Sequence, residues 1–499
     1  MENEGGGPIT AFTLNEEILC RIERNDPSVA NIWISEKNWI EGAGLAIAKS
    51  TCLKKLSLWA EGEFDDWIPC FCKKWLQRNR SIETFSLIED RSFYFCDSAI
   101  SCLAPFFKHN HNLRSVSFSC LGEYKYWDIE YIMKVLSACK NDQLERIELY
   151  HVKGSGMEVV GFLNMLCTKQ QNLLQLDISD LFEHQNDAWT TAPYAALANL
   201  LENPASKIQE LRIKPDKGIL DTLADVLMST ETLTSLDLSH GFLDEEDLLE
   251  FVDVLPSCSL EKLSISHFNE NELNLIGAAL AENKTLKHLD LSDNYDITAA
   301  GWQEFAKCLK NPFSALEELD LRGCQMDDKK AAVIFSNLAK NSCLEILHMK
   351  THGQMAVTTY QVWEVLFRAL CDTSSIDSIA FSSNHALHTL DICSEENGAP
   401  EDVISLLEMN KHDSKAETAR QKILKHHLSE GKSKLQVFAR MPETVMPCAL
   451  GWIGKDHHGF SVMYNVLQSL PSLVGNSITG HNAAGIKKRK VLCTATTHV

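Results

Sequence analysis

Residues 286–294 read Leu-Lys-His-Leu-Asp-Leu-Ser-Asp-Asn, with leucine at the first, fourth and sixth positions of the stretch. Around the last two leucines, apolar and polar residues alternate, which is the pattern of a strand with one buried face. The same phrase recurs along the chain from Val29 to Ile376. Twelve intervals separate its copies over 347 residues, a mean of about 29 residues per repeat.

The copies of this phrase mark the strands that the sequence predicts. A further copy begins at Leu387, only 11 residues after the one at Ile376, which is too close for another strand and helix. The regularly spaced copies begin at Val29, Leu53, Ile82, Leu113, Leu144, Leu173, Ile208, Leu233, Leu260, Leu286, Leu316, Leu344 and Ile376.

The segments between these copies have the apolar spacing of helices. Leu273, Ile276 and Leu280, for example, follow an i, i+3, i+7 pattern that places them on one face of a helix. Because one strand and one helix alternate in a constant order, the strands must run parallel. We therefore predict an α/β solenoid with parallel strands on its concave face and helices on its convex face.

Two neighbouring copies carry a family resemblance. Residues 286–294 and 316–324, with Gly301 and Asn311 between them, resemble the leucine-rich repeats of the ribonuclease-inhibitor-like type. The resemblance extends over about residues 28–383 and implies a horseshoe-shaped solenoid. Members of the wider group bind proteins, including nucleases, small GTPases, actin and ubiquitin-ligase substrates, but they share no one set of binding residues.

The turn after the strand departs from that family's usual pattern. The Asn or Cys that normally follows the strand is present at Asn294 and Cys324, but other residues, such as Leu181 and Phe268, take this place in most copies. We therefore expect less regular turns, mainly in the first half. Residues 424–473 resemble the tail of uncharacterised leucine-rich-repeat proteins of microalgae, and this resemblance implies no chemistry.

The repeat boundaries predict four parts of the chain. These are an N-terminal segment or cap (1–27), a solenoid of about 13 repeats (28–393), a helical C-terminal cap (394–475) and a flexible tail (476–499). A cap is expected because the last repeat of a solenoid has an open apolar side. Its three predicted helices have apolar faces at Val403, Leu406 and Leu407, at Ile423, Leu424 and Leu428, and at Val462, Val466 and Leu470.

The charge balance restricts the partners. The chain has 68 acidic and 47 basic residues and a net charge of −21, so nucleic-acid phosphates and anionic membranes would be repelled. A basic or neutral protein partner fits better, and we expect the chain to be a monomer. The last 99 residues differ from the rest, because they carry 13 basic and 8 acidic side chains.

The cysteines and the termini point to a compartment. The 17 cysteines are odd in number and include no Cys-x-x-Cys pair, and the first residues lack the features of a signal peptide. No apolar run reaches the roughly 20 residues that span a bilayer. We expect reduced thiols and a cytoplasmic protein. The alternative is nuclear entry through the basic run Lys487, Lys488, Arg489 and Lys490.

The sequence offers no catalytic residues, and we expect no enzyme activity, no cofactor and no metal. Residues 451–456 hint at a phosphate-binding loop, but Ala449 stands at the first glycine position of that motif and Asp456 at the Ser/Thr position. Cys70 and Cys72 lack a second ligand pair at metal-binding spacing. Other cysteines recur at fixed places in the repeat, which favours small buried side chains.

The strand phrase itself supplies a candidate binding surface. If positions 4 and 6 face the core, then positions 3, 5 and 7 face outwards, onto the concave face. Aspartate and serine are common at these positions in this repeat type. The alternative interpretation is therefore a polar face that contacts only solvent. The predicted protein-binding residues are Trp33, Trp59, Ile88, Tyr150, Arg212, Lys214, Asp237, Asp290, Asp320, Arg322, His348 and Lys350.

Trp33 and Trp59 are the least expected of these residues. Neighbouring parallel strands lie about 4.8 Å apart, so the two rings can touch across their strands. An outward-facing aromatic pair is typical of a binding site, but residues 8–27 could instead fold over it as a cap. Together these features predict a protein-interaction scaffold or adaptor, with regulation of a small GTPase or substrate recognition for a ubiquitin ligase as the alternative.

Overall fold

The computed structural model divides into two compact units, residues 1–362 with 389–398 and residues 363–388 with 399–499. The described residues are 12–35, 42–61, 67–90, 100–121, 126–140, 142–179, 181, 191–215, 218–239, 241, 245–311, 314–350, 359–392 and 399–428. Among the helices in these ranges, none has both the length and the apolar composition that a bilayer span requires.

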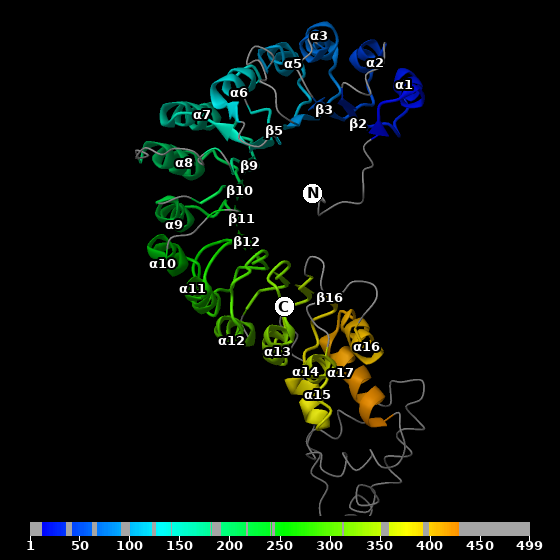
Figure 1. The fold of residues 1–499 in the computed structure, drawn as a ribbon, viewed down its shortest axis with the longest axis vertical. Helices are drawn as coiled ribbons and strands as arrows, with labels where there is room; N and C mark the ends of the chain where they lie inside the picture. Colours follow the sequence, from blue (N-terminus) through cyan, green and yellow to red (C-terminus); the bar gives the residue numbers. More distant parts are fainter. Residues whose placement is uncertain are drawn as a thin grey trace, which may run out of the picture. The chain divides into compact units, whose positions relative to one another are not determined.

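The first unit is built on one parallel sheet of 14 strands, in which neighbours in space are neighbours in the repeat order. Figure 1 shows the strands as the inner layer of this unit. They are β1 (Phe12–Thr13), β2 (Asn31–Ser35), β3 (Lys55–Glu61), β4 (Thr84–Asp90), β5 (Ser115–Cys120), β7 (Arg146–Tyr150), β9 (Gln175–Asp177), β10 (Glu210–Arg212), β11 (Ser235–Leu238), β12 (Lys262–Ile265), β13 (His288–Asp290), β14 (Glu318–Asp320), β15 (Ile346–His348) and β16 (Thr389–Asp391).

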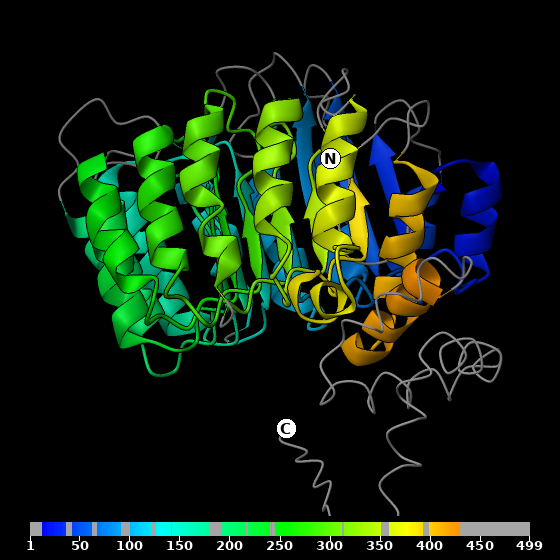
Figure 2. The same ribbon diagram turned by 90° about the horizontal axis from the view of Figure 1, so that it is seen from below.

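The helices form the second layer of this unit, and Figure 2 shows the green ones side by side in front of the strands. A separate pair of short strands, β6 (Trp127–Asp128) and β8 (Val152–Lys153), lies beside α6 and α7. The helices are α1 (Glu16–Glu23), α2 (Ala43–Lys49), α3 (Trp67–Lys74), α5 (Ala104–His109), α6 (Ile129–Leu136), α7 (Gly156–Lys169), α8 (Ala192–Glu202), α9 (Ile219–Ser229), α10 (Glu245–Val254), α11 (Glu270–Leu280), α12 (Ala299–Phe305) and α13 (Asp328–Asn337), with 3-10 turns η2 (Leu76–Arg78) and η3 (Cys308–Lys310). Most of α14 (Tyr360–Leu370) belongs to the second unit.

The apolar spacing of the repeat explains this packing. Position 4 of each copy aligns with position 4 of the next, so that Leu263, Leu289 and Leu319 form one buried row across β12, β13 and β14. Position 6 continues the core with residues such as Leu291 and Leu321. Burial of each such leucine contributes about 1.5–3 kcal/mol, which is why the strand register is fixed along the sheet. The predicted α/β solenoid with parallel strands and outer helices is therefore confirmed.

Buried side-chain amides join one repeat to the next. At Asn341, the side-chain NH2 donates to the Leu309 carbonyl of the preceding repeat, and its oxygen accepts from the backbone N–H of Leu344 at 2.7 Å. Asn79 makes the equivalent bonds, to the Ile47 carbonyl and from the Ile82 N–H. Each amide thereby satisfies backbone groups that the end of a helix would otherwise leave unpaired.

The phrase at Ile376 was predicted as a strand, and this prediction is wrong. Residues Ile376–Ser382 form helix α15, which begins where the Ser375 side chain accepts a hydrogen bond from the Ser378 N–H. Ile376 and Ile379 are spaced i, i+3, which suits a helical face as well as a strand phrase. The strand that follows β15 is β16, from the copy at Leu387, so the spacing between these two copies is 43 residues.

The N-terminal residues that are described extend the repeat array. β1 pairs in parallel with β2, and α1 packs beside α2. Asn15 caps α1, accepting a hydrogen bond from the Ile18 N–H at 2.8 Å. Residues 12–13 therefore lie beside the strand that carries Trp33 and not across its face. The four-part division of the chain stays a prediction.

The second unit is helical over its described residues. Besides the larger part of α14, it contains α15, α16 (Glu401–Asn410), α17 (Lys415–Ile423) and a π-helical turn, η4 (Leu424–Leu428). The apolar face predicted at Val403, Leu406 and Leu407 is buried on α16. The predicted third helix around Val462 lies outside the described residues.

A buried lysine holds three segments of this second unit together. The Lys422 ammonium donates to the carbonyls of Leu370 and Asn384, at 2.7 and 2.8 Å. Its side chain is fully buried, and this burial lowers the pKa of Lys422 to about 7. The lysine thus ends α14 by pairing with a carbonyl at its C-terminus, where a positive charge is favourable.

Candidate functional site

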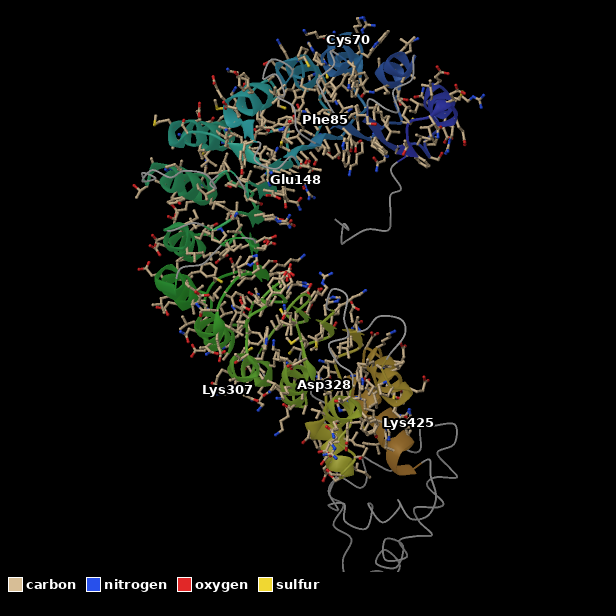
Figure 3. All side chains as sticks on the ribbon, viewed as in Figure 1. Cys70, Phe85, Glu148, Lys307, Asp328 and Lys425 are labelled. Atoms are coloured by element: carbon tan, nitrogen blue, oxygen red, sulfur yellow. The ribbon has the colours of Figure 1, made fainter. Side chains whose placement is uncertain are left out.

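The face of the sheet that the helices leave open carries positions 3, 5 and 7 of the repeat. Figure 3 shows Glu148 on this inner face, whereas Cys70 and Lys307 lie on the helical side. A groove of about 280 Å³ follows the inner face from β7 to β14. Its lining residues are Arg146, Ile147, Glu148, Gln175, Leu176, Asp177, Glu210, Leu211, Arg212, Ser235, Asp237, Lys262, Leu263, Ser264, His288, Leu289, Asp290, Glu318 and Asp320.

Position 5 forms one continuous row along this groove, because each position-5 residue is in register with the next. The row contains six carboxylates, one arginine, one histidine and one serine. In sheet order it reads Glu148, Asp177, Arg212, Asp237, Ser264, Asp290, Asp320, His348 and Asp391. We call this set the position-5 row.

Four of these aspartates also have a structural task. Asp290 accepts a hydrogen bond from the backbone N–H of Ser292 at 2.8 Å, two residues further along. Asp177, Asp237 and Asp320 accept the equivalent bond at 2.9–3.1 Å. This local bond competes with the strand ladder, because it takes the N–H of position 7. Part of the acidic row is therefore a consequence of how this repeat ends its strands.

Arg212 is the one arginine of the position-5 row. Its Nε lies 2.5 Å from Asp237 Oδ2, and its Nη1 lies 3.4 Å from Asp177 Oδ2. Burial disfavours the charged guanidinium, but the carboxylates of Asp237 and Asp177 outweigh this effect and raise the pKa of Arg212. The arginine bridges the strands on both sides of its own.

Asp290 lies in a different environment in the same row. Burial raises its pKa, and the neighbouring carboxylate of Asp320 raises it further, while the hydrogen bonds from Ser292 act in the opposite direction. Within the described part of the chain, no cationic side chain forms an ion pair with Asp290. Asp320 differs, because Arg322 Nε donates to its carboxylate at 2.8 Å.

The last strands of the sheet add two histidines. His288 Nδ1 is 2.8 Å from Glu318 Oε2, and His348 Nε2 is 3.3 Å from Glu318 Oε1. His348 Nδ1 faces Asp391 at 3.8 Å. Lys350 is exposed just beyond β15, and Lys214 is half-buried beyond β10.

The first strands carry an aromatic patch in place of charges. The Trp33 and Trp59 rings are 6.2 Å apart between centroids and tilted by 58°, so the predicted contact across the strands is present. Ile88 is in register with Trp59, and all three side chains are half-buried. Tyr150 lies further along position 7 and stacks on His151, with centroids 6.3 Å apart.

Position 7 is less exposed than the alternation predicts. Ser35, Ser179 and Ser266 are all buried, at 1%, 6% and 3% of their full exposure. The Ser179 hydroxyl turns to the carboxylate of Asp177 at 2.5 Å, so it supports the strand end. Ala380 and Ser382 stand at positions 5 and 7 of the copy at Ile376, and they lie on helix α15 and not on a strand.

The structure adds groove residues that the sequence prediction omitted. Glu210, His288 and Glu318 occupy position 3 of the repeat, which alternation also places on the open face. Tabulating position 3 together with positions 5 and 7 would have found them. Asp391 was missed because the copy at Ile376, not the one at Leu387, was taken as the last strand.

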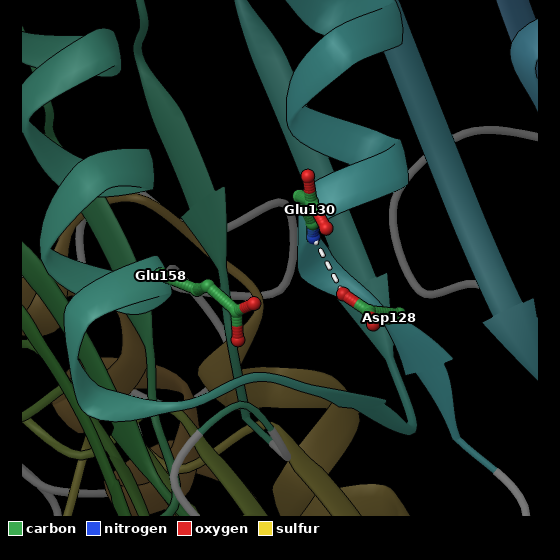
Figure 4. Close-up of side chains that lie close together, drawn as sticks. All are labelled: Asp128, Glu130 and Glu158. Atoms are coloured by element: carbon green, nitrogen blue, oxygen red, sulfur yellow. Dashed lines mark hydrogen bonds between the residues drawn. The ribbon is translucent and has the colours of Figure 1, made fainter.

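A separate acidic group lies at the edge of the second, two-stranded sheet. Carboxylate oxygens of Asp128, Glu130 and Glu158 lie within 4.8 Å of one another (Figure 4). Asp128 caps α6 by accepting from the Glu130 N–H at 2.8 Å, and Glu158 accepts from the Ser155 N–H and hydroxyl in a capping box on α7. The hydrogen bonds from Ser155 lower the pKa of Glu158. Two of these three carboxylates are thus explained by helix capping.

Several buried cysteines have properties of packing residues. Burial raises the pKa of the Cys139 and Cys308 thiols to about 12 in each case. The Cys324 Sγ donates to the Leu291 carbonyl at 3.0 Å. This is the hydrogen bond to the turn backbone that the resemblance to leucine-rich repeats implies for a cysteine at this position. A thiol that stays protonated is a poor nucleophile and a poor metal ligand.

Known proteins match parts of this chain. Mouse "NACHT, LRR and PYD domains-containing protein 14" is 28% identical over 186 residues, which are 36% of this chain and 19% of that protein. Mouse protein 5 of the same series is 26% identical over 250 residues, 48% of this chain and 20% of that protein. Human protein 14 is 31% identical over 152 residues, 30% of this chain and 14% of that protein.

The matched parts are a small share of those proteins. The chain spans about a fifth or less of the length of these relatives, and no protein-family profile matches it. Among solved structures, the yeast complex of Rad7 and Elc1 aligns over 78% of this chain and 91% of that chain, with 13% identity and a TM-score of 0.36. The repeats and the parallel sheet have the fold of a leucine-rich-repeat solenoid, and the matched relatives are named for LRR domains.

Proposed function

We propose that this chain is a non-catalytic recognition module, a scaffold or adaptor that binds a protein partner on the open face of its sheet. The observation that carries the proposal is the position-5 row, which gives one uncovered face a groove and a continuous line of polar groups. Open faces of repeat arrays serve as extended binding surfaces because neighbouring repeats present the same position side by side.

The groove favours a basic partner. Its lining contains seven carboxylates, from Glu148, Asp177, Glu210, Asp237, Asp290, Glu318 and Asp320, against three cations, from Arg146, Arg212 and Lys262. Such a surface attracts a positively charged partner over distances of about the screening length, 8 Å at physiological salt. The aromatic patch of Trp33, Trp59 and Ile88 would add apolar contact area at the other end of the face.

The finer assignments belong to the same proposal. We take the repeats to be of the ribonuclease-inhibitor-like type and the protein to be a cytoplasmic monomer without metal or cofactor. Nuclear entry through residues 487–490 is the alternative, and that run lies outside the described residues. Regulation of a small GTPase or substrate recognition for a ubiquitin ligase is the second candidate, and it rests on the family resemblance alone.

The test is affinity capture from native cells with matched charge-reversal variants, followed by mass spectrometry. Asp290→Lys combined with Glu318→Lys changes the open face, whereas Glu282→Lys combined with Glu304→Lys makes the same charge change on the helical side. The proposal expects a partner that wild type and the helical-side variant retain and the open-face variant loses. Loss of the partner by the helical-side variant alone would contradict it.

Two further assays separate the second candidate from a plain scaffold. A GTPase regulator would change the rate of GTP hydrolysis by its captured partner. A ubiquitin-ligase adaptor would bring ligase subunits into the capture.

A further inference from the structure

We propose that Ser264 marks a slot for a cationic side chain of the partner, between Asp237 and Asp290 on the open face. The inference rests on the proposed function, because it names the part of the partner that the groove receives. The slot is defined by three strands, β11, β12 and β13, and all three residues line the groove.

The chain itself shows how such a slot is filled. Arg212 on β10 lies between two position-5 aspartates on the neighbouring strands, and its guanidinium contacts both, at 2.5 and 3.4 Å. Two strands further on, Ser264 lies in register between Asp237 and Asp290 in the same way. Asp237 belongs to both places and already contacts Arg212, whereas Asp290 has no ion pair among the described residues, and Ser264 is too short to reach either carboxylate.

The spacing of the sheet makes the two places equivalent. Neighbouring strands lie about 4.8 Å apart, so the aspartates that flank Ser264 are as far apart along the sheet as those that flank Arg212. A guanidinium of the partner above Ser264 can therefore approach the same kind of carboxylate pair. Arginine suits this geometry better than lysine, because its planar fork donates in two directions at once.

The slot still has acceptor capacity. Among the described residues, the Asp290 carboxylate is hydrogen-bonded only to Ser292, and it forms no ion pair. Asp320, on the next strand, adds a third carboxylate on the far side of Asp290. Repulsion between carboxylates is relieved when a cation arrives, so binding gains from charges that the free protein keeps close together.

Among the described residues, three cations lie near the slot: Lys262, Arg212 and Arg322. Lys262 precedes Ser264 by two residues on β12, so it is on the same face and exposed, about 6.6 Å away along the strand. Two of the three nearby carboxylates are already ion-paired, Asp237 with Arg212 and Asp320 with Arg322, whereas Asp290 has no such partner among the described residues. Asp290 is therefore the carboxylate with which the partner's arginine would pair.

The probe for this slot is a fluorescein-labelled Gly-Arg-Gly-Arg-Gly-Arg-Gly peptide, with a citrulline copy that keeps the shape and removes the charge. Binding is measured by fluorescence anisotropy at low salt on the full chain. Wild type should bind the arginine peptide at least about tenfold more tightly than the citrulline peptide, the scale of a charged hydrogen-bonded pair.

Three variants locate the binding. Ser264→Arg places the chain's own guanidinium in the slot and should weaken the arginine peptide by about tenfold or more. Asp290→Asn should do the same while keeping an oxygen for the Ser292 N–H, and it tests the slot even if Ser264→Arg does not fold. Ala278→Arg, on the exposed side of α11, carries the same added charge as Ser264→Arg and should change affinity by no more than about twofold.

Each outcome decides for or against the slot. Equal binding of the arginine and citrulline peptides, no measurable binding to wild type, or equal losses from Ser264→Arg and Ala278→Arg would overturn it. If Asp290→Asn binds the arginine peptide like wild type, the slot also fails. The open-face proposal fails separately, when variants on the helical side alone release the captured partner.

Discussion

Two stretches of one sheet share a fold but differ at position 5 of the repeat. In β3, β4 and β5, position 5 is serine, and the strands run for seven, seven and six residues. In β9, β13 and β14 it is aspartate and each strand has three residues, and in β11 it is aspartate and the strand has four. The serines are Ser57, Ser86 and Ser117.

The difference has a local cause. An aspartate at position 5 takes the N–H of position 7, so that N–H is not available to a neighbouring strand, whereas the serine strands continue to pairs such as Ala60 with Glu89. β15 is equally short, and both of its neighbours, β14 and β16, end at an aspartate. The residue that shortens the strand also charges the open face, so strand length and surface chemistry change together.

The aromatic stretch should show the largest binding effect. Replacing Trp33 and Trp59 with Ala should weaken the captured partner by about 2 kcal/mol or more, because buried aromatic anchors dominate interfaces. The melting temperature should stay nearly unchanged, since both rings are half-buried on the open face. Calorimetric titration and thermal unfolding measure the two effects.

Met157→Ala is the control for this double variant. Met157 is 79% exposed on α7, in the helical layer, so its truncation removes apolar surface from the other side of the unit. A collapse of the melting temperature in the tryptophan variant would show that the two rings are core residues and not part of a binding face.

Position 5 should affect stability in the aspartate stretch and not in the serine stretch. Asp320→Ala leaves the Arg322 N–H and guanidinium without their acceptor, so the free energy of unfolding should fall by about 2 kcal/mol. Ser117→Ala should cost less than about 0.5 kcal/mol. Urea unfolding of both variants compares them, and equal losses would contradict the structural role of the aspartate.

Salt should separate the two stretches kinetically. Association with a basic partner should slow by roughly tenfold as NaCl rises from about 50 to about 500 mM, because the acidic groove steers the encounter. The tryptophan double variant should keep this salt dependence and dissociate faster. Stopped-flow or biosensor kinetics measures both rates, and an association rate that ignores salt would exclude steering by the acidic groove.

The smallest expected effect is the contribution of Asp290 to the pH dependence of folding stability. The pKa of Asp290 is raised in the folded protein, so its ionised form is disfavoured there relative to the unfolded chain. Its penalty is absent below the unfolded pKa and complete above the folded one, so stability falls across that interval as pH rises. Asp290→Asn should therefore raise the melting temperature at pH 7, on the order of 1 °C, and leave it unchanged at pH 3. A lower melting temperature at pH 7 would mean that the charge is stabilising.

The repeat spacing was enough to predict the fold class and most strands. Leucines at positions 4 and 6 lie on the same face of a strand, which indicates a sheet with one buried face. Strands such as β13 could therefore be predicted from the sequence. The copy at Ile376 misled because an i, i+3 pair also fits a helix, and the choice was made by the Ser375 cap and by the strand pairing of residues 389–391.

The candidate site was only partly predictable. Alternation indicated which side chains face outwards, and register then determined which of them are neighbours across strands. The bridge from Arg212 to Asp177 and Asp237 depends on rotamers and on residues 25 and 35 positions away in the sequence, which no local pattern specifies. The burial of Ser179 likewise follows from its bond to Asp177, not from alternation.

The most direct test of the account is carboxylate labelling of the chain with and without its captured partner, read by mass spectrometry. Carbodiimide and glycine ethyl ester modify exposed carboxylates, and the groove and the helical side both offer them. Binding on the open face predicts that labelling of Asp237, Asp290 and Glu318 falls severalfold in the complex while Glu282 and Glu304 are unchanged. Unchanged labelling of the groove, with protection of Glu282 or Glu304, would contradict recognition by the open face.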